Sequence, residues 1–253
     1  MPAVFVHGVP ETSVLWNGVR AHLGGAAADA VALDLPGFGA DRPAGFTATK
    51  DAYAAWLADA LRGIDGPIDL VGHDWGAGLV LRVVTGLGVP VRSWAVDVAS
   101  VLHPEYVWHN VAQVWQTPSV GEKWMTESRL ARSGGRGVLE TMLLDAGAPE
   151  ADAQAIQAAN DETMGECVLA LYRSAVPNPF ADWGQQLVAP TSGAGLVLQA
   201  TADEFDDVAA STEMAARLGA RTERLDGLGH WWMLQDPGAA AAVLTRFWST
   251  LAE

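Results

Sequence analysis

The sequence contains few of the residues that disulfide-rich, nucleic-acid-binding and membrane-spanning proteins need. Cys167 is the only cysteine among 253 residues, so the chain forms no internal disulfide. Only Lys50 and Lys123 are lysines, and 30 acidic residues outnumber 15 basic ones, which gives a formal net charge of −15. Such a charge repels nucleic acid and anionic lipid. No apolar run approaches the roughly 20 residues that a membrane-spanning helix needs.

These absences also bear on the cellular compartment of the protein and on its binding partners. The chain enters an apolar, strand-like run at Ala3–Val6, with no basic segment or cleavage site before it. We therefore expect a cytoplasmic protein that acts on a small molecule and water, with no nucleic acid and no membrane among its partners. The sequence carries no signal of oligomeric state.

Apolar runs alternate with helical patterns along most of the chain. This alternation predicts an α/β fold with a doubly wound, mostly parallel sheet of about six strands. The expected strands are Ala3–Val6, 30–35, 68–72, 91–98, 195–199 and Arg221–Leu225, and the expected helices are 14–23, 47–61, 77–87, 211–218 and 238–251.

The alternation stops between His103 and Phe180, where the pattern is helical and rich in aromatic residues. No convincing strand falls in this stretch, and strands resume after Pro190. The sequence therefore predicts a core domain made of residues 1–102 and 181–253. A helical cap subdomain, residues 103–180, is inserted into it after the fourth strand.

The motif Gly72-His73-Asp74-Trp75-Gly76 joins a predicted strand to a predicted helix. A Gly-x-Asp-x-Gly turn in this position is typical of a nucleophile elbow, with aspartate where hydrolases usually carry serine. A carboxylate displaces a leaving group from saturated carbon and leaves an alkyl ester on the protein. The motif therefore indicates a nucleophilic Asp74 that opens an epoxide or removes a halide.

An ester on Asp74 needs a base that activates water and an acid that orients the base. His230 lies in a glycine-rich loop after the last strand, at the same sheet edge as the elbow, and neutral imidazole is the natural base near pH 7. Asp203 follows the strand 195–199 by a short turn, so nucleophile, acid and histidine have the expected chain order. Asp97, within an apolar strand, is the alternative acid, because a buried carboxylate needs a partner.

Backbone N–H groups are expected to stabilise the oxyanion that forms when water attacks the ester. Trp75, directly after the nucleophile, supplies one group, and Val9 in the loop after the first strand supplies the other. Gly8 lets the backbone approach the site closely. No cluster of His, Asp and Glu has recognisable ligand spacing, so neither a metal nor a cofactor is expected.

Together these residues resemble the α/β-hydrolase fold superfamily and, within it, the aspartate-nucleophile branch of epoxide hydrolases and haloalkane dehalogenases. The resemblance spans nearly the whole chain and is closest to the epoxide hydrolases. The segments that carry it, in the family's order, are His7-Gly8-Val9-Pro10-Glu11, Asp34-Leu35-Pro36-Gly37-Phe38-Gly39, Gly72-His73-Asp74-Trp75-Gly76 and Gly229-His230-Trp231.

The resemblance also implies how the departing oxygen is stabilised. Tyr172 is similar to the family's second cap tyrosine, which hydrogen-bonds the epoxide oxygen. No tyrosine stands near Val111, where the first cap tyrosine is expected. Four residues stay open as its substitute: Tyr106, Trp108, His109 and Trp115.

Three functions stay open at this level. The first is hydrolysis of an epoxide to a vicinal diol through an ester on Asp74, which water activated by His230 then cleaves. The second is haloalkane dehalogenation by the same three residues, with Trp75 and a second indole holding the halide. The third is a homologue that binds small molecules without catalysis. In each case Trp108, Trp115 and Trp231 are expected to line an apolar substrate pocket.

Overall fold

One parallel sheet forms the centre of the computed structural model, which describes residues 2–24, 29–129, 135–187 and 192–251. Within these residues the sheet has six strands, in the order β2-β1-β3-β4-β5-β6, and every neighbouring pair is parallel. The predicted α/β fold with about six strands is confirmed. The strands are β1 (Ala3–Val6), β2 (Val31–Leu33), β3 (Asp69–Gly72), β4 (Ser93–Val96), β5 (Ala194–Ala200) and β6 (Arg221–Leu225).

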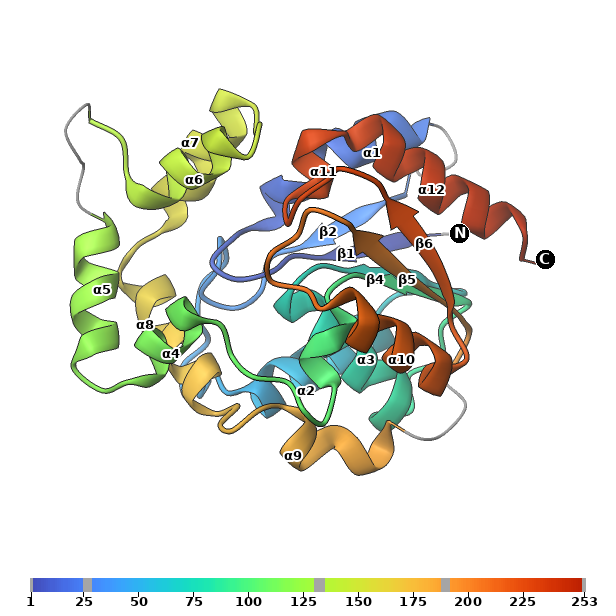
Figure 1. Cartoon of the computed structure of the whole chain (residues 1–253), viewed down its shortest axis with the longest axis horizontal. Helices are drawn as coiled ribbons and strands as arrows, with labels where there is room; N and C mark the ends of the chain where they lie inside the picture. Colours follow the sequence, from blue (N-terminus) through green and yellow to red (C-terminus); the bar gives the residue numbers. More distant parts are fainter. Residues whose placement is uncertain (1, 25–28, 130–134, 188–191, 252–253) are drawn as a thin grey trace.

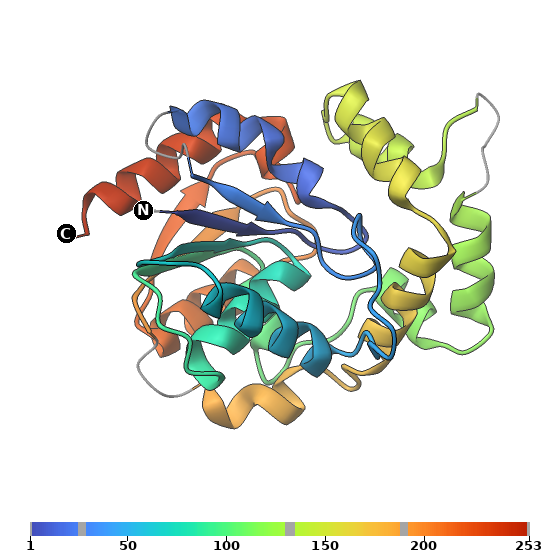
Figure 2. The same cartoon turned by 180° about the vertical axis from the view of Figure 1, so that it is seen from behind.

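Alternate side chains of the central strands enter two separate cores, as the strand period of two requires. In β1, Val4 and Val6 belong to one buried cluster, and Ala3 and Phe5 to the other. Three helices cover the first face, α2 (Lys50–Arg62), α3 (Trp75–Gly86) and α10 (Val208–Leu218), whereas α1 (Asn17–Leu23) and α12 (Pro237–Ser249) cover the second (Figure 1 and Figure 2). Burial on both faces explains why these strands read as continuous apolar runs.

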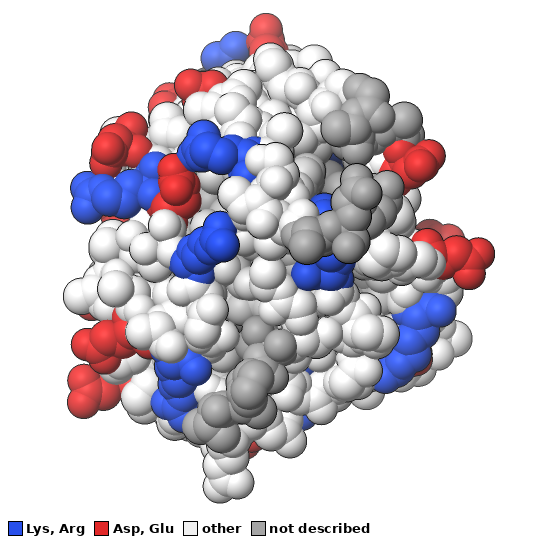
Figure 3. Space-filling model, turned by 90° about the vertical axis from the view of Figure 1, so that its right-hand side faces the viewer, with Lys and Arg blue, Asp and Glu red and all other residues white. Residues whose placement is uncertain are grey.

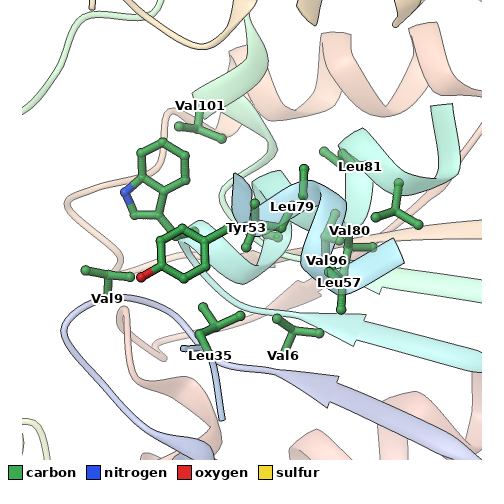
Figure 4. Close-up of a cluster of buried hydrophobic side chains, with 14 of the residues drawn as sticks. Val6, Val9, Leu35, Tyr53, Leu57, Leu79, Val80, Leu81, Val96 and Val101 are labelled. Carbon is green, nitrogen blue, oxygen red and sulfur yellow. The ribbon is translucent and has the colours of Figure 1, made fainter. Parts of the chain in front are cut away.

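The first core extends from the sheet to the loop that follows β1. Figure 4 shows Val6 and Val96 of the sheet close to Leu57 of α2 and Leu79 of α3, with Val9 at the end of the cluster. Apolar packing thus fixes the loop after β1 against the helix that follows β3.

Between β4 and β5 the described residues form helices and no strand. Helices α5, α6 and α7 stand away from the sheet, at the left of Figure 1. Residues 130–134 of the predicted cap lie outside the described residues, and its predicted end coincides with the first residue of α9, so the domain limits stay a prediction. The helices are α4 (Asn110–Gln116), α5 (Val120–Arg129), α6 (Val138–Asp145), α7 (Glu150–Ala159), α8 (Glu162–Arg173) and α9 (Phe180–Trp183).

Local details differ from the sequence predictions. Helix α3 begins at Trp75, two residues before the predicted start, because the elbow residue itself is its N-cap. The predicted helix 14–23 is a 3-10 turn, Ser13–Trp16, that leads into α1. The short helix α11 (Trp232–Gln235) was not predicted. No helix in the described part of the chain combines the length and apolar character needed to cross a membrane.

Charge is dispersed over the face at the amino ends of the strands. Figure 3 shows this face with basic and acidic side chains interspersed among uncharged ones. The net charge of −15 therefore does not gather on this side of the molecule.

Candidate active site

The six parallel strands end at one edge of the sheet (Figure 1), and five of the sequence-predicted residues each follow one of these strands. Val9 follows β1, Asp74 follows β3, Asp97 follows β4, Asp203 follows β5 and His230 follows β6. Parallel strands place their carboxyl ends side by side, so residues far apart in sequence come within bonding distance.

The elbow holds Asp74 in a backbone conformation that most residues avoid. Its φ is 50° and its ψ is −119°, between the end of β3 and the start of α3. A Cβ atom on Gly72 would lie 2.6 Å from the carbonyl oxygen of Gly76, and one on Gly76 would collide with the carbonyl oxygen of Val6. The two glycines are therefore required for a turn this tight, and the turn presents Asp74 at the sheet edge.

Asp74 accepts a hydrogen bond from the loop that follows β1. The Val9 N–H donates to Asp74 Oδ1 over 3.0 Å. A Cβ atom on Gly8 would lie 2.6 Å from the Cβ atom of Asp74, so only glycine permits this approach. The structure thus brings together the two predicted partners, nucleophile and oxyanion donor.

Burial dominates the electrostatics of Asp74. It raises the pKa of Asp74 to about 6, against the attraction of His230 and His73 and the hydrogen bond from the Trp75 N–H, which lower it. At pH 7 the carboxyl group is still ionised for the most part. A carboxylate in an apolar setting is a stronger nucleophile than a fully hydrated one.

His230 pairs with Asp203 and not with Asp97. Nδ1 of His230 lies 2.9 Å from Asp203 Oδ2, while the N–H of Phe205 donates to Asp203 Oδ1 over 2.8 Å. Burial and His73 lower the pKa of His230, but the hydrogen bond and charge of Asp203, together with the charge of Asp74, outweigh them and raise it above its usual value. Because Nδ1 is bound to the carboxylate, Nε2 is the nitrogen left for a proton transfer.

Asp97, the alternative acid, contacts three other groups. Its Oδ1 accepts the N–H of Asp74 over 2.9 Å, and its Oδ2 lies 2.5 Å from Nδ1 of His73 and accepts the indole N–H of Trp232 over 2.6 Å. The Asp97 side chain therefore holds the backbone N–H of Asp74 at the elbow.

Glu11 is a buried carboxylate to which the sequence analysis gave no role. Its Oε2 accepts the N–H of Gly8 over 3.1 Å, and its Oε1 accepts the indole N–H of Trp231 and lies 3.5 Å from Nε2 of His73. Burial would raise the pKa of Glu11, but the charges of His73 and His230 and the hydrogen bonds from His73 and Trp231 together outweigh it, and the pKa falls to about 2. Glu11 thus connects the loop after β1, the elbow and the segment that carries His230.

Glu11, His73 and His230 have potential metal ligand atoms within 4.8 Å of one another, and they are the one such group among the described residues. Burial lowers the pKa of His73, but Asp97 and Glu11 outweigh it and raise this pKa well above its usual value. A doubly protonated imidazole has no lone pair for a metal. His73 therefore fits an imidazolium between the carboxylates of Glu11 and Asp97.

An apolar cavity of about 100 Å³ lies beside Asp74 and His230. This volume suits a small ligand, since clefts for drug-sized molecules measure about 300–1,000 Å³. Two predicted pocket residues, Trp115 and Trp231, line it. The third, Trp108, donates its indole N–H to the carbonyl of Ala175 and lines a separate cavity of about 10 Å³ that Asp74 also lines.

Two tyrosines lie near the carboxylate of Asp74. Tyr172 of α8 is fully buried and lines the larger cavity, with its ring edge-on to Trp75 at 5.5 Å between centroids. Tyr106 lines the smaller cavity. Burial, followed by the charge of Asp74, raises the pKa of both phenols. Both phenols therefore remain protonated near pH 7.

Comparisons with known proteins agree with this architecture. A model of the alpha/beta hydrolase family matches residues 3–243. A haloalkane dehalogenase loop variant from Bradyrhizobium elkanii superposes with a TM-score of 0.68 at 18% identity, over 99% of this chain and 91% of that one. A mutant epoxide hydrolase from Bacillus megaterium gives 0.75 at 17% identity, over 98% and 93%.

A third structure widens the range of chemistry found on this fold. A thermophilic esterase from Thermogutta terrifontis superposes with a TM-score of 0.75 at 18% identity, over 100% of this chain and 91% of that one. No curated protein sequence matches the chain. At such identities the likeness shows the fold, and the reaction has to be argued from the site.

Proposed function

The chain belongs to the alpha/beta hydrolase family, and we propose that it hydrolyses small apolar epoxides to vicinal diols through an ester on Asp74. The observation that carries the proposal is the environment of Asp74. A buried carboxylate stands on a strained elbow, with the Val9 N–H on Oδ1 and two protonated phenols nearby. A serine at this position would favour acyl transfer, whereas a carboxylate favours attack on saturated carbon.

In the first step Asp74 attacks a ring carbon of the epoxide. Because Oδ1 is held by the Val9 N–H, Oδ2 forms the new C–O bond and the ring C–O bond breaks. Its electron pair moves to the departing oxygen, which takes a proton from Tyr172. The products are a hydroxyalkyl ester on Asp74 and a phenolate on Tyr172.

In the second step water cleaves the ester. Nε2 of His230 takes a proton from water as the water oxygen attacks the ester carbonyl, and Asp203 stabilises the imidazolium through Nδ1. The amides of Val9 and Trp75 hold the oxyanion. When the intermediate collapses, the bond between the carboxyl carbon and the substrate oxygen breaks, and this oxygen takes the remaining proton of the attacking water. Asp74 is thereby regenerated as a carboxylate and the diol leaves, while the proton on His230 returns to the phenolate of Tyr172 through solvent.

Haloalkane dehalogenation is the second candidate, and two indoles favour it. The indole nitrogens of Trp75 and Trp115 are buried and have no hydrogen-bond partner among the described residues. Both rings pack on Tyr172, at 5.5 and 4.7 Å between centroids. Trp75 and Trp115 each line a cavity that contains Asp74. Two unpaired N–H groups would suit a departing halide, whereas a departing alkoxide also needs the proton that a phenol supplies.

Parallel assays with styrene oxide and with an alkyl bromide separate these candidates. We expect diol from the first substrate, with slower or no bromide release from the second. Bromide release without diol formation would assign the chain to the dehalogenases. If neither substrate reacts while a ligand still raises the temperature of unfolding, the non-catalytic alternative holds.

Replacing Tyr172 by phenylalanine should slow ester formation from styrene oxide about 100-fold, because a positioned general acid typically contributes 10²–10⁴-fold. Bromide release should change far less, since a halide leaves without a proton. Single-turnover rates measure both effects. Tyr53→Phe is the matched control, because the Tyr53 hydroxyl donates to the carbonyl of Pro36 over 2.7 Å and does not line the cavity. An unchanged epoxide rate in Tyr172→Phe would remove Tyr172 from the mechanism.

The rate of ester formation should fall on the acid side with an apparent pKa near 6. The pKa of Asp74 is raised to about 6, mainly by burial, and a protonated carboxyl group does not attack. Below this pH the rate should drop about tenfold per pH unit, and above it the rate should level off. Single-turnover consumption of styrene oxide, measured as a function of pH, tests this. An acid limb near 4, the ordinary value for aspartate, would show that burial does not govern this carboxylate.

A further inference from the structure

The two cavities that Asp74 lines differ greatly in volume. The larger, of about 100 Å³, is also lined by His230 and Tyr172, whereas the smaller, of about 10 Å³, admits about one water molecule. Asp74, His109 and Phe205 form part of the wall of both cavities. A substrate group that extends past Asp74 out of the larger cavity would therefore meet the smaller one.

Val98 lines the smaller cavity and has a left-handed backbone conformation, with a φ of 42° and a ψ of 36°. Branching at Cβ makes this conformation costly for valine, whereas glycine adopts it readily. Val98 follows Asp97, whose two carboxylate oxygens are both bound, and its carbonyl accepts the N–H of Val101 over 3.1 Å. The contacts on both sides of Val98 therefore impose its backbone conformation, but they do not require a valine side chain.

The side chain of Val98 closes the smaller cavity. It is buried, and together with Trp75, Val101 and Trp108 it forms the apolar part of the cavity wall. Glycine at this position would relieve the strain, but it would enlarge the space beside Asp74 by the volume of an isopropyl group. Strained residues that persist next to a reactive group point to a role in function. The valine therefore keeps this space small at a cost in backbone strain.

We propose that Val98 is a specificity-determining residue, and that the cavity it closes makes the protein select terminal epoxides over trans-1,2-disubstituted ones. The proposal rests on the proposed function and names its substrate class. A terminal epoxide has its substituent in the larger cavity and an unsubstituted ring carbon. A trans-disubstituted epoxide carries a second group on the opposite side of the ring, and this group would have to enter a space that admits about one water molecule. The packed wall would then have to move before the ring reaches Asp74.

Two phenyl epoxides test the proposal on the parent protein. Styrene oxide carries only the phenyl group, and trans-1-phenyl-1,2-epoxybutane carries an ethyl group on the other ring carbon as well. We expect kcat/KM for the second epoxide to be roughly 10- to 100-fold lower, the scale on which a packed pocket discriminates between alkyl groups. Equal values would overturn the proposal and leave the proposed function standing. If neither epoxide is converted to diol, both are wrong.

Val98→Gly and Val98→Ala should narrow the difference between the two epoxides. Both variants enlarge the smaller cavity, and the alanine variant keeps a Cβ atom in case glycine loosens the turn. We expect the kcat/KM for the ethyl-substituted epoxide, divided by that for styrene oxide, to rise about tenfold. Comparing this ratio between proteins cancels the intrinsic reactivity of the epoxides and any general loss of activity. An unchanged ratio in both variants would overturn the role of Val98.

Ala48→Gly is the matched control. Ala48 is also buried and has a φ of 55°, but it lines neither cavity that contains Asp74. This variant relieves backbone strain without enlarging the space beside Asp74, so its ratio should equal that of the parent protein. A ratio that rises in Ala48→Gly as much as in Val98→Gly would show that strain relief and not cavity size sets the selectivity, and it would overturn the proposal.

Discussion

Replacing Asp74 by asparagine is expected to abolish turnover of every substrate class, with a loss of about 10⁴-fold or more, the scale at which single catalytic groups act. An amide has no charge with which to displace a leaving group. The backbone should tolerate the change, because asparagine is enriched at positive φ and Asp74 has a φ of 50°. Initial rates with styrene oxide and with an alkyl bromide measure the loss.

The Asp74→Asn variant should also remain folded. Burial raises the pKa of Asp74 in the folded state, so near neutral pH the charged carboxylate opposes folding, and a neutral amide should not lower the temperature of unfolding. Asp226→Asn, at an exposed position, is the control and should keep full activity. Activity in freshly purified Asp74→Asn would remove the carboxylate from the mechanism.

Replacing His230 by glutamine is expected to stop turnover after one event per active site. Attack by Asp74 does not use the imidazole, so the ester should form, but no base then takes the proton from water. The rate of ester hydrolysis should fall by about 10³-fold or more. Consumption of styrene oxide by a known concentration of protein measures this, with a plateau at one equivalent.

His22→Gln is the control for the His230 variant. His22 is exposed on α1, and its Nδ1 lies 2.8 Å from the carbonyl of Gly18, on the far side of the sheet from α3. This variant should consume substrate continuously. Continuous consumption by His230→Gln at the parent rate would mean that another group activates water.

The set formed by Asp74, Asp203 and His230 could be predicted from the sequence, because local pattern and chain order carried the information. The glycines of the elbow mark Asp74, and the positions of Asp203 and His230 after two strands place both at the same sheet edge. The structure brings them together, with 2.9 Å between His230 and Asp203. Chain order left Asp97 open as the acid, and only the three-dimensional contacts distinguish the two carboxylates.

The residues that support the set could not be predicted, because their contacts join distant parts of the chain. Glu11 and Trp231 are 220 positions apart, and His73 and Asp97 are joined across neighbouring strands. Tyr106 was one of four residues that the sequence left open as a cap donor. It lies in a segment without helix or strand, so no periodicity could single it out. The sequence also could not divide the predicted pocket residues between the two cavities, of which Trp108 lines the smaller, with its indole N–H on the carbonyl of Ala175.

The most direct test of the account is the mass of the peptide that carries Asp74, taken from His230→Gln after incubation with styrene oxide. The account predicts that this peptide gains the mass of one substrate molecule, and that the same peptide from Asp74→Asn gains nothing. An unmodified Asp74 peptide, from a substrate that the parent protein converts to diol, would contradict the covalent mechanism.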